Sequence, residues 1–276
     1  GIVAVTGYGS DVNLCSEGLT AVNPATLTNP RYELWAIAQV AAAGGDTDIW
    51  LREAISDTWR NYLDMPNTIA AENRFAIWHF PGMGRIMFRL KIGDLGSAAS
   101  GYGGPLERST DRGLTWATVL SNCGALTRSP NGDLWATADA RGAPASFQPR
   151  SIYRSGAANG GATWTLMATD TTAGVGAVMT KYTQIRVDPN DARRVMVVGG
   201  LETNVVRYGY SSTGTTNPAV FTFGTAVGVP SFRDGTAALG VFINLEAGGA
   251  RRFIMGLSQV DGLAKFIYVT DDNGLN

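Results

Sequence analysis

The sequence predicts an all-β fold assembled from one repeated four-stranded unit. Three observations predict it: a glycine-rich, charge-poor composition, a polar octet that recurs along the chain, and two series of markers that recur in step. Of 276 residues, 35 are glycine and only 16% are charged, against about a quarter charged in typical globular domains. Abundant glycine favours many short strands joined by tight turns.

Length and charge exclude several classes of protein. A chain of 276 residues is near the upper limit for a single hydrophobic core. The net charge of −1 gives no basic surface for nucleic acid or anionic lipid. The longest apolar stretch, residues 34–45, is too short to span a bilayer. We therefore expect no nucleic-acid partner and no membrane insertion.

Terminal and cysteine patterns bear on localisation and cofactors. The opening GIVAVTGYGS has no basic region, so it is no intact signal peptide. Either the chain is not exported by that route or the signal is already removed. The sequence leaves the location unknown, and an extracellular or virion-associated location is favoured. Cys15 and Cys123 are too few for a disulfide scaffold, and we expect no bond between them. His79 is the only histidine, which disfavours most zinc and histidine-based sites. We expect no metal and no cofactor.

The octet reads Ser109-x-Asp111-x-Gly113-x-Thr115-Trp116. An aspartate in a turn accepts hydrogen bonds from nearby backbone N–H groups, and Gly113 permits a positive φ. The hydroxyls of Ser109 and Thr115 can bond to the loop backbone. Trp116 is expected to turn inward and bury about 150–250 Å². The octet therefore predicts a loop that is closed by its own side-chain hydrogen bonds and is followed by a buried tryptophan.

The octet recurs further along the chain. A second copy, after Ser155 and with two extra residues, places Asn159, Gly161, Thr163 and Trp164 at the Asp, Gly, Thr and Trp positions. A truncated third copy ends the chain with Thr270, Asp272, Gly274 and Asn276. Weaker copies keep Thr58-Trp59, and Ser211, Ser212 and Phe221.

Two marker series recur along the chain with nearly the same spacing. The aromatic anchors fall at 59, 116, 164, 221 and a virtual 277, with gaps of 57, 48, 57 and 56. Prolines that end apolar runs fall at 24, 81, 130 and 189, with Ala247 in fifth place, and their gaps are 57, 49, 59 and 58. Both series have their short gap in the same place. Five repeats with a period near 50 favour a β-propeller or a solenoid.

Each repeat reads as four strands, which is the composition of a propeller blade. In the third repeat an extended segment ends at Pro130, and Asn131-Gly132 is a hairpin signal. Two more strands and the octet loop follow before the fourth strand. The expected blades are residues 18–63, 73–120, 124–167, 182–226, and 239–276 together with 1–8.

The two ends of the chain complement each other. The fifth blade lacks its outer strand, and residues 1–8 form a strand that no blade uses. Pairing them closes a five-bladed ring and removes two exposed sheet edges. The alternative is a fragment of a larger six- or seven-bladed propeller.

The octet resembles the Asp-box, or BNR repeat, of sialidase-like β-propellers. The resemblance implies loops between the third and fourth strands of each blade, at the periphery and away from the substrate face. The resemblance then gives a structural role, which is to hold these loops closed, to Asp111, Asn159 and Asp272. The alternative for residues 270–274 is a metal site.

The resemblance does not extend to the catalytic residues of sialidases. Those enzymes use three arginines, a tyrosine activated by a glutamate, and an aspartate, with an early Phe/Tyr-Arg-Ile-Pro segment. The nearest segments here, PRYELW and SFRDGT, do not fit it. A glycosidase also needs two carboxylates facing one sugar bond, and no spacing in the sequence pairs two. We therefore favour a protein that is not an enzyme; if it is one, a glycoside hydrolase is expected.

The favoured hypothesis is a non-catalytic recognition or adhesion module for a glycan or a protein partner, in a phage tail or receptor-binding protein. The virion placement rests on the uncharged composition and divergent repeats. The alternatives are a sialidase-like glycoside hydrolase and a scaffold factor in a multi-subunit assembly. Candidate ligand-binding residues are four on the innermost strands and one in a Gly/Ser loop: His79, Arg128, Arg186, Asn244 and Tyr102.

Overall fold

The protein is described by a computed structural model that confirms the all-β prediction. Its described elements are antiparallel β-strands and one short 3₁₀ turn. Contacts divide the chain into two units, residues 1–94 with 106–118, and residues 95–105 with 119–276. The structure describes residues 12–17, 33–39, 47–53, 59–65, 74–78, 80, 82–92, 104–139, 150–171, 181–188, 190–200, 206–214, 220–225, 238–243, 252–258 and 265–270.

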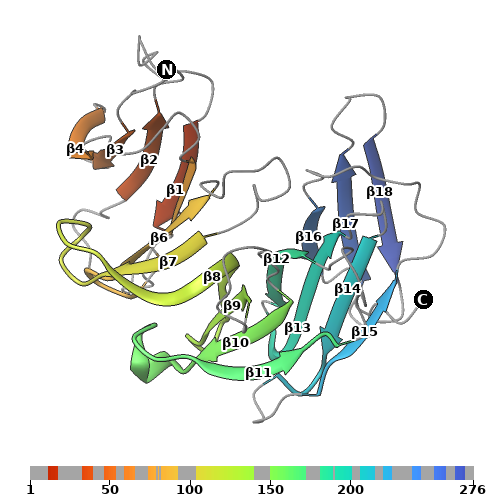
Figure 1. The fold of residues 1–276 in the computed structure, drawn as a ribbon. Coiled ribbons are helices and arrows are strands. Elements are labelled where there is room, and N and C mark those ends of the chain that lie inside the picture. The colour runs from red at the N-terminus through yellow and green to blue at the C-terminus, as the bar shows by residue number, and fades with distance from the viewer. Residues whose placement is uncertain are drawn as a thin grey trace, which may run out of the picture. The chain divides into compact units, whose positions relative to one another are not determined.

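The first unit begins with a four-stranded antiparallel sheet in chain order (Figure 1). Its strands are β1 (Val12–Glu17), β2 (Glu33–Gln39), β3 (Thr47–Glu53) and β4 (Trp59–Met65). The first strand lies earlier than the segment 18–24 expected from the proline series. Val12–Glu17 pairs with β2 along its whole length, and every residue in it has the N–H that a ladder needs, whereas Pro24 has none.

The same unit continues with β5 (Arg74–Trp78), β6 (Met87–Ile92) and β7 (Gly104–Ser109), which begin a seven-stranded sheet of order β5 to β11. Met87, Phe88 and Leu90 are fully buried on β6. Leu106 on β7 is also buried and is the register partner of Leu90. These apolar side chains form the described core of this unit.

β8 (Ala117–Arg128) carries the chain from the first unit into the second. Its residues Cys123–Arg128 pair with β9 (Leu134–Ala138), with a register shift between Cys123 and Ala125. Asn122, just before this pairing, has φ = 52°, a conformation that asparagine tolerates better than most residues. The expected boundary between the second and third repeats, 120/124, falls at this point.

The second unit completes the seven-stranded sheet and adds two more. β10 (Ser151–Ser155), the 3₁₀ turn η2 (Ala157–Asn159) and β11 (Thr165–Thr169) follow β9. A four-stranded sheet runs in chain order through β12 (Lys181–Asp188), β13 (Asp191–Gly200), β14 (Val206–Ser211) and β15 (Thr222–Thr225). A sheet of three described strands follows, made of β16 (Ala238–Ile243), β17 (Arg252–Ser258) and β18 (Lys265–Thr270).

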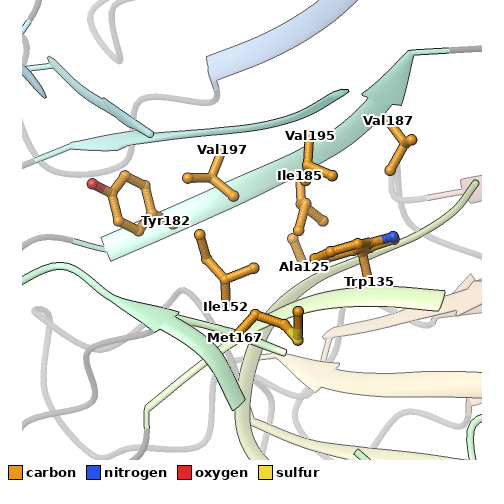
Figure 2. Close-up of a cluster of buried hydrophobic side chains, with 9 residues drawn as sticks. All are labelled: Ala125, Trp135, Ile152, Met167, Tyr182, Ile185, Val187, Val195 and Val197. Carbon is orange, nitrogen blue, oxygen red and sulfur yellow. The ribbon is translucent and has the colours of Figure 1, made fainter. Parts of the chain in front are cut away.

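One buried cluster joins the sheets of β8–β11 and β12–β15 (Figure 2). Trp135 and Ile152 contribute from one sheet, and Tyr182, Ile185 and Val197 from the other. The ring of Phe223 on β15 stacks at 6.0 Å from that of Tyr182. Burying one such large side chain contributes roughly 1.5–3 kcal/mol, so this interface fixes the two sheets to each other.

The remaining fold predictions fall partly outside the described ranges. Residues 1–8, which we expect to complete the last sheet, lie outside them. Among the described residues, no helix has the length and apolar character needed to cross a membrane.

Candidate functional site

The loop between β7 and β8 carries the full octet, and its side chains bond to the loop itself. The Asp111 carboxylate accepts from the backbone N–H of Thr115 at 2.9 Å, the Thr115 hydroxyl at 2.5 Å and the Ser109 hydroxyl at 2.7 Å. Ser109 Oγ accepts from the N–H groups of Gly113 at 2.7 Å and Asp111 at 3.2 Å. Both polar side chains at the start of the octet are therefore used within the loop.

These bonds shift the titration of Asp111. The hydroxyl and backbone N–H of Thr115, together with the Ser109 hydroxyl, lower the pKa of Asp111 from 3.8 to about 2. Hydrogen bonds to the charged form of a carboxylate favour that form. The loop is thus held closed by an ionised aspartate at neutral pH.

The glycine and tryptophan of the octet pack together. Gly113 has φ = 89°, and a Cβ there would lie 3.1 Å from Cζ2 of Trp116. The guanidinium of Arg89, which is ion-paired with Glu107, lies 4.5 Å from the centre of a Trp116 ring. Trp116 is half-buried, and the guanidinium of Arg89 covers one face of its ring.

The loop between β10 and β11 carries the second copy and is closed differently. Ser155 Oγ again accepts from the N–H of the glycine, here Gly161 at 3.1 Å. Asn159 and Thr163, the counterparts of Asp111 and Thr115, are both exposed. The side chain of Asn159 makes no hydrogen bond to any residue that the structure describes. Instead, backbone bonds such as Asn159 N to Gly156 O at 2.9 Å shape the loop.

A carboxylate for this second loop comes from another hairpin. Asp133, after the turn between β8 and β9, accepts from the backbone N–H of Ala157 at 2.9 Å. Its other oxygen accepts from Arg154, with Nε at 2.8 Å and Nη2 at 2.6 Å. The Asp133 side chain is only 6% exposed. Asp133 therefore connects the hairpin between β8 and β9 to the octet loop between β10 and β11.

The weaker copy that begins at Ser211, between β14 and β15, is closed by hydroxyl groups without a carboxylate. Ser211 Oγ accepts from Thr213 N at 3.1 Å, as Ser109 does from Asp111. Thr213 Oγ1 then accepts from Val220 N at 3.2 Å. A threonine hydroxyl here takes the position of the aspartate. The sequence pattern indicated Ser211, Ser212 and Phe221 in this copy but not Thr213, which the Ser-x-Asp spacing could have found.

Two of these loops are tied to their neighbouring hairpin by the same backbone bond. The residue after the Asp position donates its N–H to a hairpin carbonyl, from Arg112 to Arg85 at 3.1 Å and from Gly214 to Arg193 at 2.8 Å. In the second copy the carboxylate of Asp133 provides the corresponding connection. The octet loops are therefore structural connections between hairpins.

The sheet of β8–β11 has two chemically distinct ends. We call the end formed by residues 129–133 and 156–164 the box end, since it carries the octet loop. The far end is formed by Asn122, Asp139, Arg150 and Asp170, where these strands begin or finish. In the sheet of β12–β15, the turn that joins Asp188 to Asp191 and the octet residues 211–214 lie at the corresponding box end.

Two of the predicted ligand-binding residues lie at the box end. The Nη2 of Arg128 lies 3.3 Å from the position that a Cβ on Gly132 would occupy, so its side chain covers its own hairpin. Arg186 donates to the carbonyl of Ile185 at 2.9 Å, and burial lowers its pKa. The structure does not bring these arginines to the far end. The other predicted residues, His79, Tyr102, Asn244, Asp272 and Gly274, lie outside the described residues.

The far end holds a polar cluster that the sequence patterns did not indicate. The Tyr182 hydroxyl donates to Asp170 at 2.7 Å, and both side chains are fully buried. Asp170 also donates its N–H to the carbonyl of Arg150 at 3.0 Å. Thr137 Oγ1 donates to the Tyr182 carbonyl at 2.7 Å. The cluster therefore connects β11 to the first strand of the next sheet.

Tyr153, the middle residue of β10, is partly exposed, and its phenol lies near the charge of Asp139 at this end. Burial and the nearby charge of Asp139 raise its pKa, so its phenol stays protonated at neutral pH. Asp139 is 5% exposed and follows β9, as Asp170 follows β11. In the sequence, an aspartate directly follows each of two strands, in WATAD (135–139) and MATD (167–170). This repeated position is the pattern from which the polar end of the sheet could have been predicted.

Two further side-chain features limit the chemistry of the described residues. Cys123 is a free, buried thiol, and burial raises its pKa to about 12, so it is unreactive at neutral pH. Within the described ranges, no group of three or more His, Cys, Asp or Glu side chains is placed to hold a metal ion.

Comparisons with known proteins give only a distant likeness. No family model matches the chain, and no curated protein matches it. Forty-four chains of solved structures do match. An ancestral GH74 enzyme covers 86% of this chain at 12% identity and a TM-score of 0.47, and polysaccharide lyase Uly1 covers 92% at 12% and 0.40. The chain spans 31% and 60% of those two proteins.

Proposed function

We propose that the chain is an Asp-box β-propeller that acts as a non-catalytic recognition module for a glycan or a protein partner. Five blades, with residues 1–8 completing the last one, are part of this proposal. Two sheets of four strands in chain order, and octet loops that each join a third strand to a fourth, support the propeller. Such repeated sheets build a rigid scaffold whose loops are free to vary.

The observation that carries the recognition role is how the aspartates are used. Asp111 bonds to its own loop, Asp133 to Arg154 and Ala157, and Asp170 to Tyr182. Asp188 accepts from the N–H of Asn190 at 2.8 Å and is buried. These carboxylates hold the fold together, which is a role different from that of a general acid or base open to substrate.

The far end of β8–β11 is the surface we propose for ligand contact. Tyr153, Asn122 and Arg150 are partly exposed there. Tyrosine presents an aromatic face with a polar tip, which suits contact with a sugar or a protein. The buried pair of Tyr182 and Asp170 belongs to the same end and connects β11 to β12.

A sialidase-like glycoside hydrolase is the second candidate. Asp139 and Asp170 favour it, since they end β9 and β11 at the same end of one sheet. Their burial, at 5% and 0% exposure, and the bond from Tyr182 to Asp170 favour the structural role instead. The two candidates differ in whether a glycan is only bound or is also cleaved.

The test uses the whole chain on a glycan array and against a panel of fluorogenic glycosides. We expect binding without turnover, and a loss of binding of at least about tenfold, or ~1.4 kcal/mol, for Tyr153→Ala. Arg193→Ala, an exposed residue at the box end of the next sheet, is the matched control and is expected to bind as the parent does. Turnover that disappears in Asp139→Asn would replace the proposal with the hydrolase.

A protein partner is tested separately, by purification of the chain from its native source. Recovery inside a phage particle or another multi-subunit assembly would support the virion or scaffold role. Recovery as a free chain that binds a glycan would support the adhesion role.

A further inference from the structure

Three Asn-Gly dipeptides occur in the sequence, at Asn131, Asn159 and Asn273. Asn273 lies outside the described residues. The other two lie at the same end of one sheet, in the hairpin after β8 and in the octet loop after β10. Asn-Gly is the dipeptide most prone to lose its side-chain amide, because glycine leaves the attacking backbone nitrogen unhindered. The surroundings of each asparagine then decide whether the reaction occurs.

The side chain of Asn159 is exposed and makes no hydrogen bond to a described residue. Its neighbour Gly160 has φ = 52° and donates its N–H to Ala157 at 3.2 Å. This is the longest of three backbone bonds in the loop, the others being 2.9 and 3.0 Å. The side chain under attack is therefore held by no hydrogen bond to a described residue, in contrast to that of Asn131.

The side chain of Asn131 is held on both of its polar atoms. Its Nδ2 donates to Asp133 at 3.2 Å, and its Oδ1 accepts from the N–H of Asp133 at 3.3 Å and from the hydroxyl of Ser129. Gly132 donates its N–H to the carbonyl of Ser129 at 2.9 Å. Attack on this side chain requires these bonds to break first.

We propose that Asn159 is a site of spontaneous deamidation, and that the hydrogen bonds of Asn131 protect the same dipeptide in the neighbouring hairpin. The Gly160 backbone nitrogen loses its proton and bonds to Cγ of Asn159, and the side-chain nitrogen leaves as ammonia. The resulting five-membered succinimide takes up one water molecule. Water opens it at either carbonyl, which gives aspartate or isoaspartate at position 159 with no change of oxidation state.

The aspartate product has a structural consequence. Position 159 corresponds to Asp111, so the reaction supplies the second octet with the carboxylate that the sequence lacks. The isoaspartate product instead lengthens the backbone by one atom within η2. Deamidation therefore creates two populations of this loop, one nearer to the Ser-x-Asp-x-Gly pattern and one that disrupts it.

The test is peptide mapping by mass spectrometry of the whole folded chain during incubation at mildly alkaline pH. We expect amide loss at Asn159 to be at least about tenfold faster than at Asn131, the factor that ~1.4 kcal/mol of net hydrogen bonding produces. In urea the two rates should converge, because both dipeptides are then free. Asn159→Gln, which cannot form the five-membered ring, should abolish the signal at this position.

A second pair of variants tests the protection. Ser129→Ala removes one partner of Asn131, and Asp133→Asn replaces the charged acceptor of its Nδ2 with a neutral one. Both changes should raise the rate at Asn131 toward that of Asn159, with circular dichroism used to verify folding. Equal rates at the two asparagines in the folded parent, faster loss at Asn131, or loss at Asn159 only in urea would overturn the proposal.

Discussion

The loop after β7 and the loop after β10 share one motif but are closed by carboxylates from different places. In the first, Asp111 within the loop accepts from Thr115 and Ser109. In the second, Asp133 from the neighbouring hairpin accepts from Ala157, while Asn159 is exposed. The difference shows that the repeat needs an acceptor for its loop amides and that the acceptor need not belong to the octet.

The largest expected effect is on the second loop, in Asp133→Ala. This change leaves Arg154 without its carboxylate and the Ala157 N–H without its acceptor. We expect a loss of about 3 kcal/mol of unfolding free energy, the low end for breaking a buried ion pair, since Arg154 is partly exposed. Urea denaturation measures it, and a loss below about 1 kcal/mol would show that Asp133 does not support the loop.

The two serines give the next comparison. Ser109 Oγ accepts two backbone N–H groups, whereas Ser155 Oγ accepts one. We expect Ser109→Ala to cost about 2 kcal/mol and Ser155→Ala about 1 kcal/mol, following the cost of leaving buried donors unpaired. Denaturation of both variants tests the ratio, and equal losses would contradict the difference between the loops.

The two loops are also expected to differ in how their stability responds to acid. The folded pKa of Asp111 is about 2, below its ordinary 3.8, so its stabilisation is complete above about pH 4 and is lost as the pH falls toward 2. Asp111→Asn should lower stability at neutral pH and flatten the stability curve in that window. Thermal unfolding from pH 2 to 7 measures this, and an unchanged curve would exclude an ionised staple.

The smallest expected effect comes from restoring the consensus, in Asn159→Asp. An aspartate there can accept from Thr163, as Asp111 does from Thr115. We expect a gain of about 0.5 kcal/mol, the low end for side-chain capping of backbone N–H groups, because Asp133 already closes the loop. Thermal unfolding at neutral pH checks it, and a loss of stability would show that the loop has diverged too far to use the carboxylate.

Local patterns in the sequence predicted the all-β class and the places of many strands. Alternating β-branched and aromatic residues mark β12–β15, and the spelling of the octet alone marks the loop after β7. The contact of Asp133 with Ala157 joins residues 24 apart and involves a backbone N–H, so no side-chain pattern encodes it. The bond from Tyr182 to Asp170 depends on how two sheets pack, which spacing along the chain does not fix.

Amide hydrogen exchange at single residues, compared between Asp111→Ala and Asp133→Ala, shows whether each loop has its own carboxylate. Two loops closed by two different carboxylates predict a crossed result. Asp111→Ala should speed exchange at the Thr115 amide and leave Ala157 unchanged, and Asp133→Ala should do the reverse. Unchanged protection of Ala157 in Asp133→Ala, or faster exchange at both amides in either variant, would contradict it.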